Sequence, residues 1–292
     1  MSAIEETRGI ENYAAPVALD EALEVLAGGA TVVAGGTDLM VQAGAGAVSY
    51  QPTLLNIRRI AALGGIAEHD GRVRIGALTT ITEVRENALL AERTPALVAA
   101  ADHFASDQIR NAATIGGNIC NASPAGDTIV PLLLLDAEVE LACWQGSVSL
   151  RKVALSDFFT GPGATVKASN ELLTAISFAQ PAAGSVARFT KSGPRPALEI
   201  STVSAGISGV WANGALSGVR VALGAVAPTP LRARATEAFL EGKPLDDETV
   251  AGAAETALSD CAPIDDVRAS AWYRNHLVKV YIQRMLDDVR NS

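Results

Sequence analysis

The sequence predicts an α+β protein in which two αβ units precede a smaller domain made of an antiparallel sheet and helices. Helical and β-branched segments alternate through the first 180 residues, as is typical of αβ units. Residues 181–184 form a linker, and residues 199–226 beyond it are rich in Ser, Val, Ala and Gly. The chain has 292 residues, of which 49% are hydrophobic, and is long enough for two or three domains with their own cores.

The first αβ unit consists of a helix, a strand and a glycine turn. Apolar residues within 20–27 favour a short amphipathic helix, which the glycine pair 28–29 ends. Residues 31–34 include three β-branched residues and predict a strand. The glycine pair 35–36 closes this strand.

The second unit begins near Arg58. Polar and apolar residues alternate over 72–78, which is the period of a half-buried strand. Thr80 and Glu83 match a capping box, so a helix is expected to begin there and run to about residue 87. Further along the chain, the sequence predicts helices over 95–104 and 127–135 and strands over 138–142 and 172–178.

The third unit is predicted to contain an antiparallel meander over 199–226, with turns at Asn213-Gly214 and Ser217-Gly218. Helices are expected to follow over 231–241, 246–259 and 267–289. The predicted domains are therefore residues 1–57, 58–180 and 185–292.

Charge and composition exclude several classes of function. The net charge of −9, and the absence of any Lys/Arg run longer than Arg58-Arg59, argue against a nucleic-acid partner. The most apolar stretch, 129–135, is interrupted by Pro131 and is too short to cross a bilayer, so we expect a soluble, cytoplasmic protein without membrane insertion. The three cysteines and three histidines are scattered, so no metal site is predicted and an organic cofactor is expected to carry any chemistry.

The first candidate binding segment is Val32-Val33-Ala34-Gly35-Gly36-Thr37-Asp38-Leu39. Two glycines after a strand allow positive φ angles and bring N–H groups close to a ligand, and Thr37 adds a hydroxyl, so a diphosphate fits here. A plain βα turn explains the same pattern.

The second candidate segment is a further predicted glycine turn, Thr114-Ile115-Gly116-Gly117-Asn118, which again offers glycine N–H groups with hydroxyl and amide side chains. Asp127 follows, as an acceptor for a ribose or ribityl hydroxyl, as the cap of the next helix, or as both. Neither segment has the G-x-G-x-x-G spacing of a Rossmann site. The two glycine pairs lie about 80 residues apart and suggest a large diphosphate cofactor between two subdomains.

This pair of segments resembles the FAD-binding (medium) subunit of molybdenum hydroxylases, the family of xanthine dehydrogenases and carbon monoxide dehydrogenases. The tail segments 224–230 and 266–274 are similar to the carboxy-terminal domain of that family. The resemblance implies a two-subdomain, vanillyl-alcohol-oxidase-type (PCMH-type) FAD-binding domain followed by a smaller α+β domain.

The resemblance also implies roles for particular residues. Residues 32–39 and 114–118 would wrap the pyrophosphate and ribityl chain of FAD. Phe104 and Leu173 would pack against the adenine, and plain core packing is the alternative for both. Asp127 would contact the cofactor, and Lys191 would lie beside the flavin unless it is a solvated surface lysine.

By the same resemblance, FAD in this chain accepts electrons from [2Fe-2S] clusters on a small partner subunit and passes them to NAD, oxygen or a quinone. A large partner subunit would carry the molybdopterin, and the whole would form a dimer of heterotrimers. Two alternatives remain at this stage: a stand-alone flavin-dependent reductase or oxidase of the same fold, and a non-catalytic binding protein.

Overall fold

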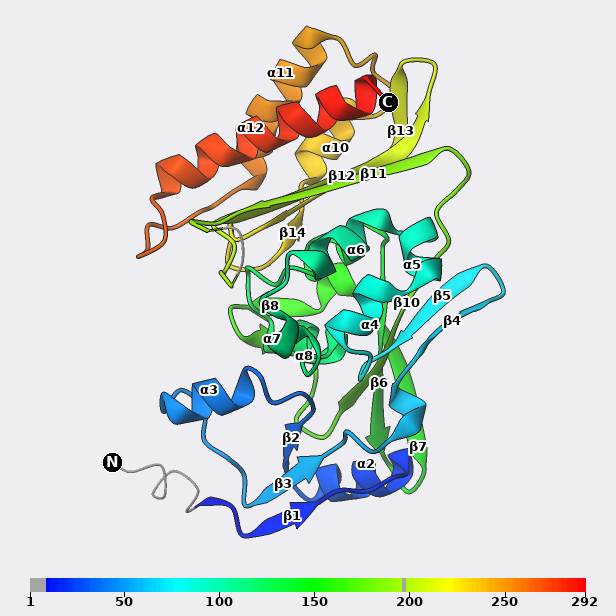
Figure 1. Cartoon of the computed structure of the whole chain (residues 1–292), viewed down its shortest axis with the longest axis vertical. Helices are drawn as coiled ribbons and strands as arrows, with labels where there is room; N and C mark the ends of the chain where they lie inside the picture. Colours follow the sequence, from blue (N-terminus) through cyan, green and yellow to red (C-terminus); the bar gives the residue numbers. More distant parts are fainter. Residues whose placement is uncertain (1–8, 196–197) are drawn as a thin grey trace.

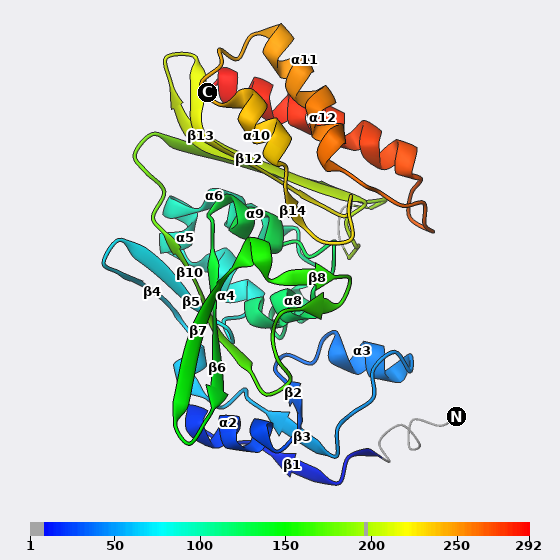
Figure 2. The same cartoon turned by 180° about the vertical axis from the view of Figure 1, so that it is seen from behind.

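The computed structural model describes residues 9–195 and 198–292. Three units are stacked along the long axis, with the amino-terminal unit at one end and the carboxy-terminal unit at the other (Figures 1 and 2). The first predicted domain begins at residue 1, so its first eight residues lie outside the described part.

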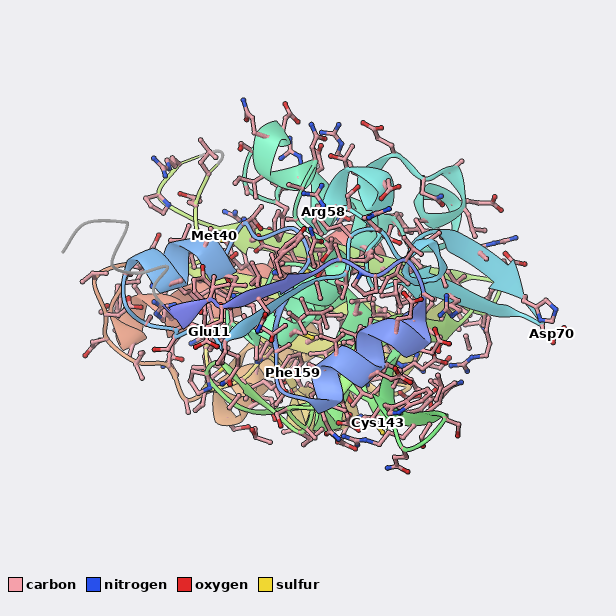
Figure 3. The ribbon with its side chains drawn as sticks, turned by 90° about the horizontal axis from the view of Figure 1, so that it is seen from below. Glu11, Met40, Arg58, Asp70, Cys143 and Phe159 are labelled. Carbon is pink, nitrogen blue, oxygen red and sulfur yellow. The ribbon has the colours of Figure 1, made fainter. Side chains whose placement is uncertain are left out.

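The amino-terminal unit is a three-stranded parallel sheet in the order β1-β3-β2. Leu23 and Leu26 on one face of α2 pack with Leu55 and Ile57 into a small core. In the view from this end of the molecule, α2 and α3 lie on opposite sides of β1 (Figure 3). The elements are β1 (Asn12–Ala14), α2 (Leu19–Ala27), β2 (Thr31–Val33), α3 (Leu39–Gly44) and β3 (Thr53–Asn56), and the short helix η2 (Ala61–Leu63) follows.

The central unit is a five-stranded antiparallel sheet in the order β4-β5-β10-β6-β7, with helices packed on one face. Its core joins Val73, Ile75 and Phe178 of the sheet to Ile115 and Leu132 of the helices. The strands are β4 (Ile66–His69), β5 (Arg72–Gly76), β6 (Glu138–Trp144), β7 (Val148–Ala154) and β10 (Leu172–Ala179), and the helices are α4 (Ile81–Glu86), α5 (Ala88–Arg93), α6 (Pro95–Asp102), α7 (Asp107–Arg110), α8 (Ile115–Asn121) and α9 (Ile129–Leu134). The short helix η3 (Leu155–Asp157) and a small hairpin, β8 (Phe159–Gly161) with β9 (Ala164–Thr165), connect β7 to β10.

The carboxy-terminal unit is a four-stranded antiparallel sheet in chain order, with three helices on the face that points away from the central unit (Figure 2). Its other face rests on α6 and α9. Gly206 permits this close approach, because a Cβ there would lie 2.8 Å from the side chain of Leu134. The elements are β11 (Ser185–Ser192), β12 (Val203–Ala212), β13 (Ala215–Gly224), β14 (Leu231–Arg232), α10 (Arg234–Leu240), α11 (Asp247–Thr256), η4 (Ala257–Asp260) and α12 (Ala271–Arg290).

The predicted α+β class and most predicted elements are confirmed. The capping box of α4 has both of its hydrogen bonds, between Thr80 and Glu83. Asn213 and Gly214 have φ values of +52° and +78° and form the predicted hairpin turn. Residues 181–184 connect β10 to β11.

Three details of the third unit were predicted wrongly. Ser217-Gly218 is not a turn: it lies inside β13, where the pairing with β12 shifts by one residue and Gly218 has a φ of +59°. Residues 231–232 pair with β13 as a strand, and the helix begins at Arg234. The last helix begins at Ala271 and not at Val267, because the Asp266 carboxylate accepts the backbone N–H groups of Arg268 and Ala269 and holds them in a turn.

Asp266 also anchors the start of α12 to the sheet through Arg274. The Arg274 guanidinium, which is 3% exposed, donates to the backbone carbonyls of Thr202 and Ala225 and to the Asp266 carboxylate at 2.8 Å. Desolvation alone would raise the pKa of Asp266, but the N–H groups of Arg268 and Ala269 and the Arg274 charge outweigh it and lower that pKa to about 2.

We predict that Asp266→Asn lowers the thermal stability of the protein at neutral pH. Because the pKa of Asp266 is lower in the folded protein than its ordinary value of 3.8, its stabilising charge is fully present above about pH 4 and is lost as the pH falls through about 2. Thermal unfolding from pH 7 down to pH 2 is the measurement. A difference in thermal stability between variant and wild type that stayed constant across this pH range would contradict the role given to the Asp266 charge.

Candidate functional site

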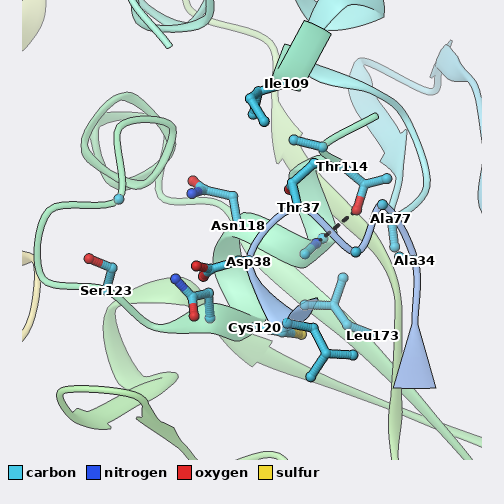
Figure 4. Close-up of a pocket in the computed structure, with 18 of the residues that line it drawn as sticks. Ala34, Thr37, Asp38, Ala77, Ile109, Thr114, Asn118, Cys120, Ser123 and Leu173 are labelled. Carbon is cyan, nitrogen blue, oxygen red and sulfur yellow. Dashed lines mark hydrogen bonds between the residues drawn. The ribbon is translucent and has the colours of Figure 1, made fainter. Parts of the chain in front are cut away.

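A cleft of about 600 Å³ opens between the amino-terminal and central units, and the loop between β11 and β12 contributes to its lining. Figure 4 shows Thr37 and Asp38 of the first candidate segment and Asn118 of the second around the same space. The structure thus brings together segments far apart in the sequence. Of the predicted site residues, those that line the cleft are Val32, Ala34, Gly35, Gly36, Thr37, Asp38, Leu39, Phe104, Thr114, Gly116, Gly117, Asn118, Asp127 and Leu173.

Three predicted site residues do not line the cleft. Val33 is part of β2, where its carbonyl accepts the N–H of Ile57. Ile115 is fully buried in the core of the central unit. Lys191 lies behind the lining of the cleft, against Asp127.

The first segment, residues 34–39, leaves a run of N–H donors available to a ligand. Within the described residues, the N–H groups of Gly35 through Leu39 donate to no protein acceptor. Gly36 has a φ of +72°, which turns the chain after β2. Gly35 serves a different purpose, because a Cβ there would lie 2.1 Å from the carbonyl oxygen of Ala112. This glycine therefore lets the first segment touch the central unit.

The second glycine pair is not the turn that was predicted. Gly116 and Gly117 lie in the first turn of α8, capped by the Thr114 hydroxyl, and neither has positive φ. The N–H groups of residues 115–117 already donate to the Thr79 carbonyl, the Ala77 carbonyl and the Thr114 hydroxyl, respectively. They do not form a second set of anion donors.

Close packing explains the second glycine pair instead. A Cβ on Gly116 would lie 2.7 Å from both the Cβ and the carbonyl oxygen of Ala77, and one on Gly117 would lie 2.9 Å from the Thr114 hydroxyl. Glycine at 116 thus brings α8 against the end of β5, and the side chains of Asn118 and Asn121 reach the cleft.

Asp127 and Lys191 form a buried ion pair of 2.8 Å, with side chains 9% and 6% exposed. Asp127 does not cap α9, whose cap residue is Thr128; it accepts instead from Lys191 and, at 2.7 Å, from the hydroxyl of Ser201. Lys191 also donates to the His103 carbonyl at 3.0 Å, so it is not a solvated surface lysine. Burial raises the pKa of the Asp127 carboxyl, and the Lys191 ammonium opposes that shift.

Arg110 fixes the loop that carries Phe104 to the cleft. One of its nitrogens donates to the carbonyls of Asp102, Phe104 and Ala105 at 3.2, 2.6 and 3.3 Å, and another donates to Asp107. Ala105 has a φ of +39°, a conformation that the Arg110 contacts hold in place. The sequence analysis did not single out Arg110, because its three carbonyl partners belong to no local motif.

Sequence analysis also missed a group of polar cleft residues. Gln42 of α3 donates to Asn121 of α8 at 2.8 Å and so connects the two walls of the cleft. Lys167 and Glu171 line the wall formed by the segment before β10, next to Cys120. Burial raises the pKa of the Cys120 thiol to about 11, and the nearby Lys167 only partly opposes this, so the thiol is protonated at neutral pH. These pairings join distant segments, and no local pattern marks them.

The cleft suits an extended cofactor that carries a diphosphate. Its volume is within the range of cofactor sites, and the N–H groups of the first segment supply anion donors that no acceptor among the described residues uses. The described residues include no cluster of three or more His, Cys, Asp or Glu side chains able to hold a metal ion. No helix in this described part is long and apolar enough to cross a bilayer.

Comparison with protein families shows the family to which the chain belongs. Residues 6–181 match the model of the FAD-binding domain in molybdopterin dehydrogenase, and residues 188–289 match that of the carboxy-terminal domain of the CO dehydrogenase flavoprotein. The chain belongs to this family of FAD-binding subunits. The resemblance predicted from the two candidate segments and the tail is thereby confirmed.

Known relatives align with this FAD-binding subunit over almost its full length. It is 35% identical to a putative xanthine dehydrogenase FAD-binding subunit of Escherichia coli (strain K12), covering 95% of each chain. It is 31% identical to the carbon monoxide dehydrogenase medium chain of Hydrogenophaga pseudoflava, covering 94% of this chain and 95% of the relative.

Solved structures agree with the comparison of sequences. Carbon monoxide dehydrogenase of H. pseudoflava superposes with a TM-score of 0.89, covering 94% of this chain and 95% of the other. Quinoline 2-oxidoreductase of Pseudomonas putida 86 does so with a TM-score of 0.88 at 28% identity, covering 96% of each chain. The predicted fold, a PCMH-type FAD-binding domain followed by a smaller α+β domain, is confirmed.

We predict that Gly35→Ala and Gly36→Ala lower the stability of this subunit for different reasons and by different amounts. Gly35→Ala places a methyl group against the Ala112 carbonyl and destabilises the apoprotein itself. Gly36→Ala has room, since its nearest neighbours lie at 3.5 Å, but the alanine must adopt positive φ at a cost of about 1–2 kcal/mol. Urea unfolding of both apoproteins is the measurement. Equal losses of stability would contradict the distinct roles given to the two glycines.

A second prediction concerns the buried ion pair. Lys191→Met leaves the Asp127 carboxylate without its counter-charge and should lower the free energy of unfolding by about 3–5 kcal/mol. The double variant Asp127→Asn with Lys191→Met removes both charges and should recover part of that loss. Urea unfolding of Lys191→Met, Asp127→Asn and the double variant gives the coupling energy. Strictly additive losses would show that the two side chains do not interact.

Proposed function

We propose that this subunit carries FAD in a heteromeric molybdenum hydroxylase and transfers electrons from the [2Fe-2S] clusters of a partner subunit to NAD, oxygen or a quinone. Membership of the family and the relatives in multisubunit dehydrogenases support this role. The observation that carries it is the run of unused N–H donors from Gly35 to Leu39 inside a cleft of suitable size. The isoalloxazine of FAD supplies the redox chemistry when the cofactor is bound.

The residues of the first segment would hold the pyrophosphate. Backbone N–H groups from Gly35 to Leu39 would donate to the anion, and the Thr37 hydroxyl would add a further donor. Because these groups have no other partner among residues 9–195 and 198–292, a diphosphate does not compete there with an internal hydrogen bond. The side chains of Thr114 and Asn118 would contribute from the opposite wall.

The remaining predicted contacts keep their roles as proposals, with one change. Phe104 and Leu173 line the cleft and are proposed to pack against the adenine. Asp127 is proposed to accept a hydroxyl of the cofactor. Lys191 is proposed to act through Asp127, since its ammonium is held by Asp127 and the His103 carbonyl.

The proposal also assigns the remaining redox groups to partner subunits. A small [2Fe-2S] subunit and a large molybdopterin subunit are proposed to complete the enzyme as a dimer of heterotrimers, located in the cytoplasm. Within this chain, we propose that residues 1–57 and 58–180 form the FAD-binding subdomains and residues 185–292 the carboxy-terminal domain.

We predict that the purified chain binds one FAD and that native purification from its host recovers two additional subunits. Flavin absorbance after reconstitution measures cofactor binding, and gel filtration measures assembly. The flavin in the isolated chain should not be reduced by the organic substrate of the holoenzyme, whereas the flavin in the whole complex should be.

Two results would overturn this function. A colourless protein that FAD fails to reconstitute would favour a non-catalytic binding protein. An isolated chain that turns over substrate by itself would favour the stand-alone flavoenzyme.

A further inference from the structure

The cleft that receives FAD is lined almost entirely by neutral and acidic side chains. Its lining includes the carboxylates of Asp38, Asp127, Glu171 and Glu199, whereas Lys167 is the single Lys or Arg among the described lining residues. A diphosphate brings further negative charge into this space. Lys167 is therefore the one cationic side chain among the described lining residues that opposes this negative charge.

Two of the four carboxylates are already neutralised by partners. Asp127 is paired with Lys191, and Glu171 accepts two hydrogen bonds from Arg151, of 2.5 and 2.7 Å. The hydrogen bonds from Arg151 hold the pKa of Glu171 below its usual value, so its carboxylate is ionised and committed to that pair.

Lys167 has no carboxylate partner within the described residues. Its ammonium donates to the backbone carbonyls of Ala168 and Glu171 at 3.1 and 3.2 Å, and both of these acceptors are neutral groups. An ammonium has three N–H donors, so one remains after these two bonds. The side chain is half-buried and its long stem is held against its own loop, which reduces the entropy that a ligand contact would otherwise remove.

We propose that Lys167 is a cofactor-binding residue, whose ammonium stabilises negative charge on FAD bound in the cleft. This inference rests on the proposed function. The charge it would meet has two sources in one ligand: the diphosphate, which is anionic in every redox state, and the isoalloxazine, which gains negative charge on reduction. A positive charge beside the first strengthens binding, and one beside the second raises the reduction potential.

The test uses the full-length chain with Lys167→Met, Lys167→Gln and Lys167→Arg. Methionine keeps the hydrocarbon stem, glutamine keeps a polar end, and arginine keeps the charge. Lys152→Met is the matched control, because it removes the same charge from β7, where Lys152 is exposed and lies outside the cleft. Three properties are measured: the Kd of FAD at low and high salt, the midpoint potential of the bound flavin, and the urea unfolding of the apoprotein.

If the charge meets the diphosphate, the Met and Gln variants should bind oxidised FAD at least about tenfold more weakly and with less dependence on salt. If it meets the isoalloxazine, the Kd of oxidised FAD should stay constant and the midpoint potential should fall. In either case Lys167→Arg should retain most of the wild-type value, and Lys152→Met should match the wild type. Unfolding curves identify any variant that loses FAD affinity because it is poorly folded. In that case Lys167→Arg is the variant compared with the wild type.

The proposal is overturned if both neutral variants match the wild type in Kd and midpoint potential, or if Lys152→Met changes them equally. It is also overturned if Lys167→Arg behaves like the neutral variants despite a stable fold. Failure of the wild-type chain to take up FAD is a separate result, which would refute the proposed function.

Discussion

The whole cleft depends on one close contact, between the backbone at Gly35 and the backbone at Ala112. With any side chain at residue 35, the first segment would be held away from the central unit. Gly116 produces a second close approach on the other side, where α8 meets Ala77 at the end of β5. Between these two contacts, the walls of the cleft lie near enough for Gln42 to bond to Asn121 across it. The contact at Gly35 thus holds the first segment, which lines the cleft, against the central unit.

The carboxy-terminal unit takes part in the same construction. Its loop between β11 and β12 lines the cleft with Leu198, Glu199 and Ile200, and the start of β12 is anchored by Arg274. Lys191 and Ser201 reach from this unit to Asp127 in the central unit. A domain that shares no strand with the other two is therefore coupled to the site through a buried charge, and not only through apolar packing.

Local chemistry explains what the sequence could predict. The capping box at Thr80 and the Asn213-Gly214 turn depend on neighbours within three residues, and both are present. The first glycine pair was recognised as a possible anion site because a strand followed by two glycines is itself a local pattern.

Non-local contacts explain what the sequence could not predict. Strands β1 and β3 pair in parallel although they lie about 40 residues apart, and no short pattern encodes such a pairing. Lys191 binds Asp127, which lies 64 residues away in the sequence, so composition could not predict that Lys191 is buried. The second glycine pair was read as a turn by analogy with the first, but Thr114 caps it as a helix. Glycine is needed at residue 116 because Ala77 packs against it, and this contact exists only in the folded chain.

The donors left without partners between Gly35 and Leu39 have a consequence for the stability of the apoprotein. In the apoprotein these groups must be hydrated, so this segment contributes less to the folded state than a fully bonded loop would. A ligand that binds them only in the folded chain shifts the unfolding equilibrium by mass action, by about 2.7 kcal/mol at a free concentration 100 times its Kd. Since the cleft draws on all three units, that gain is shared by the whole chain. Binding of the cofactor thus raises the fraction of this protein that is folded.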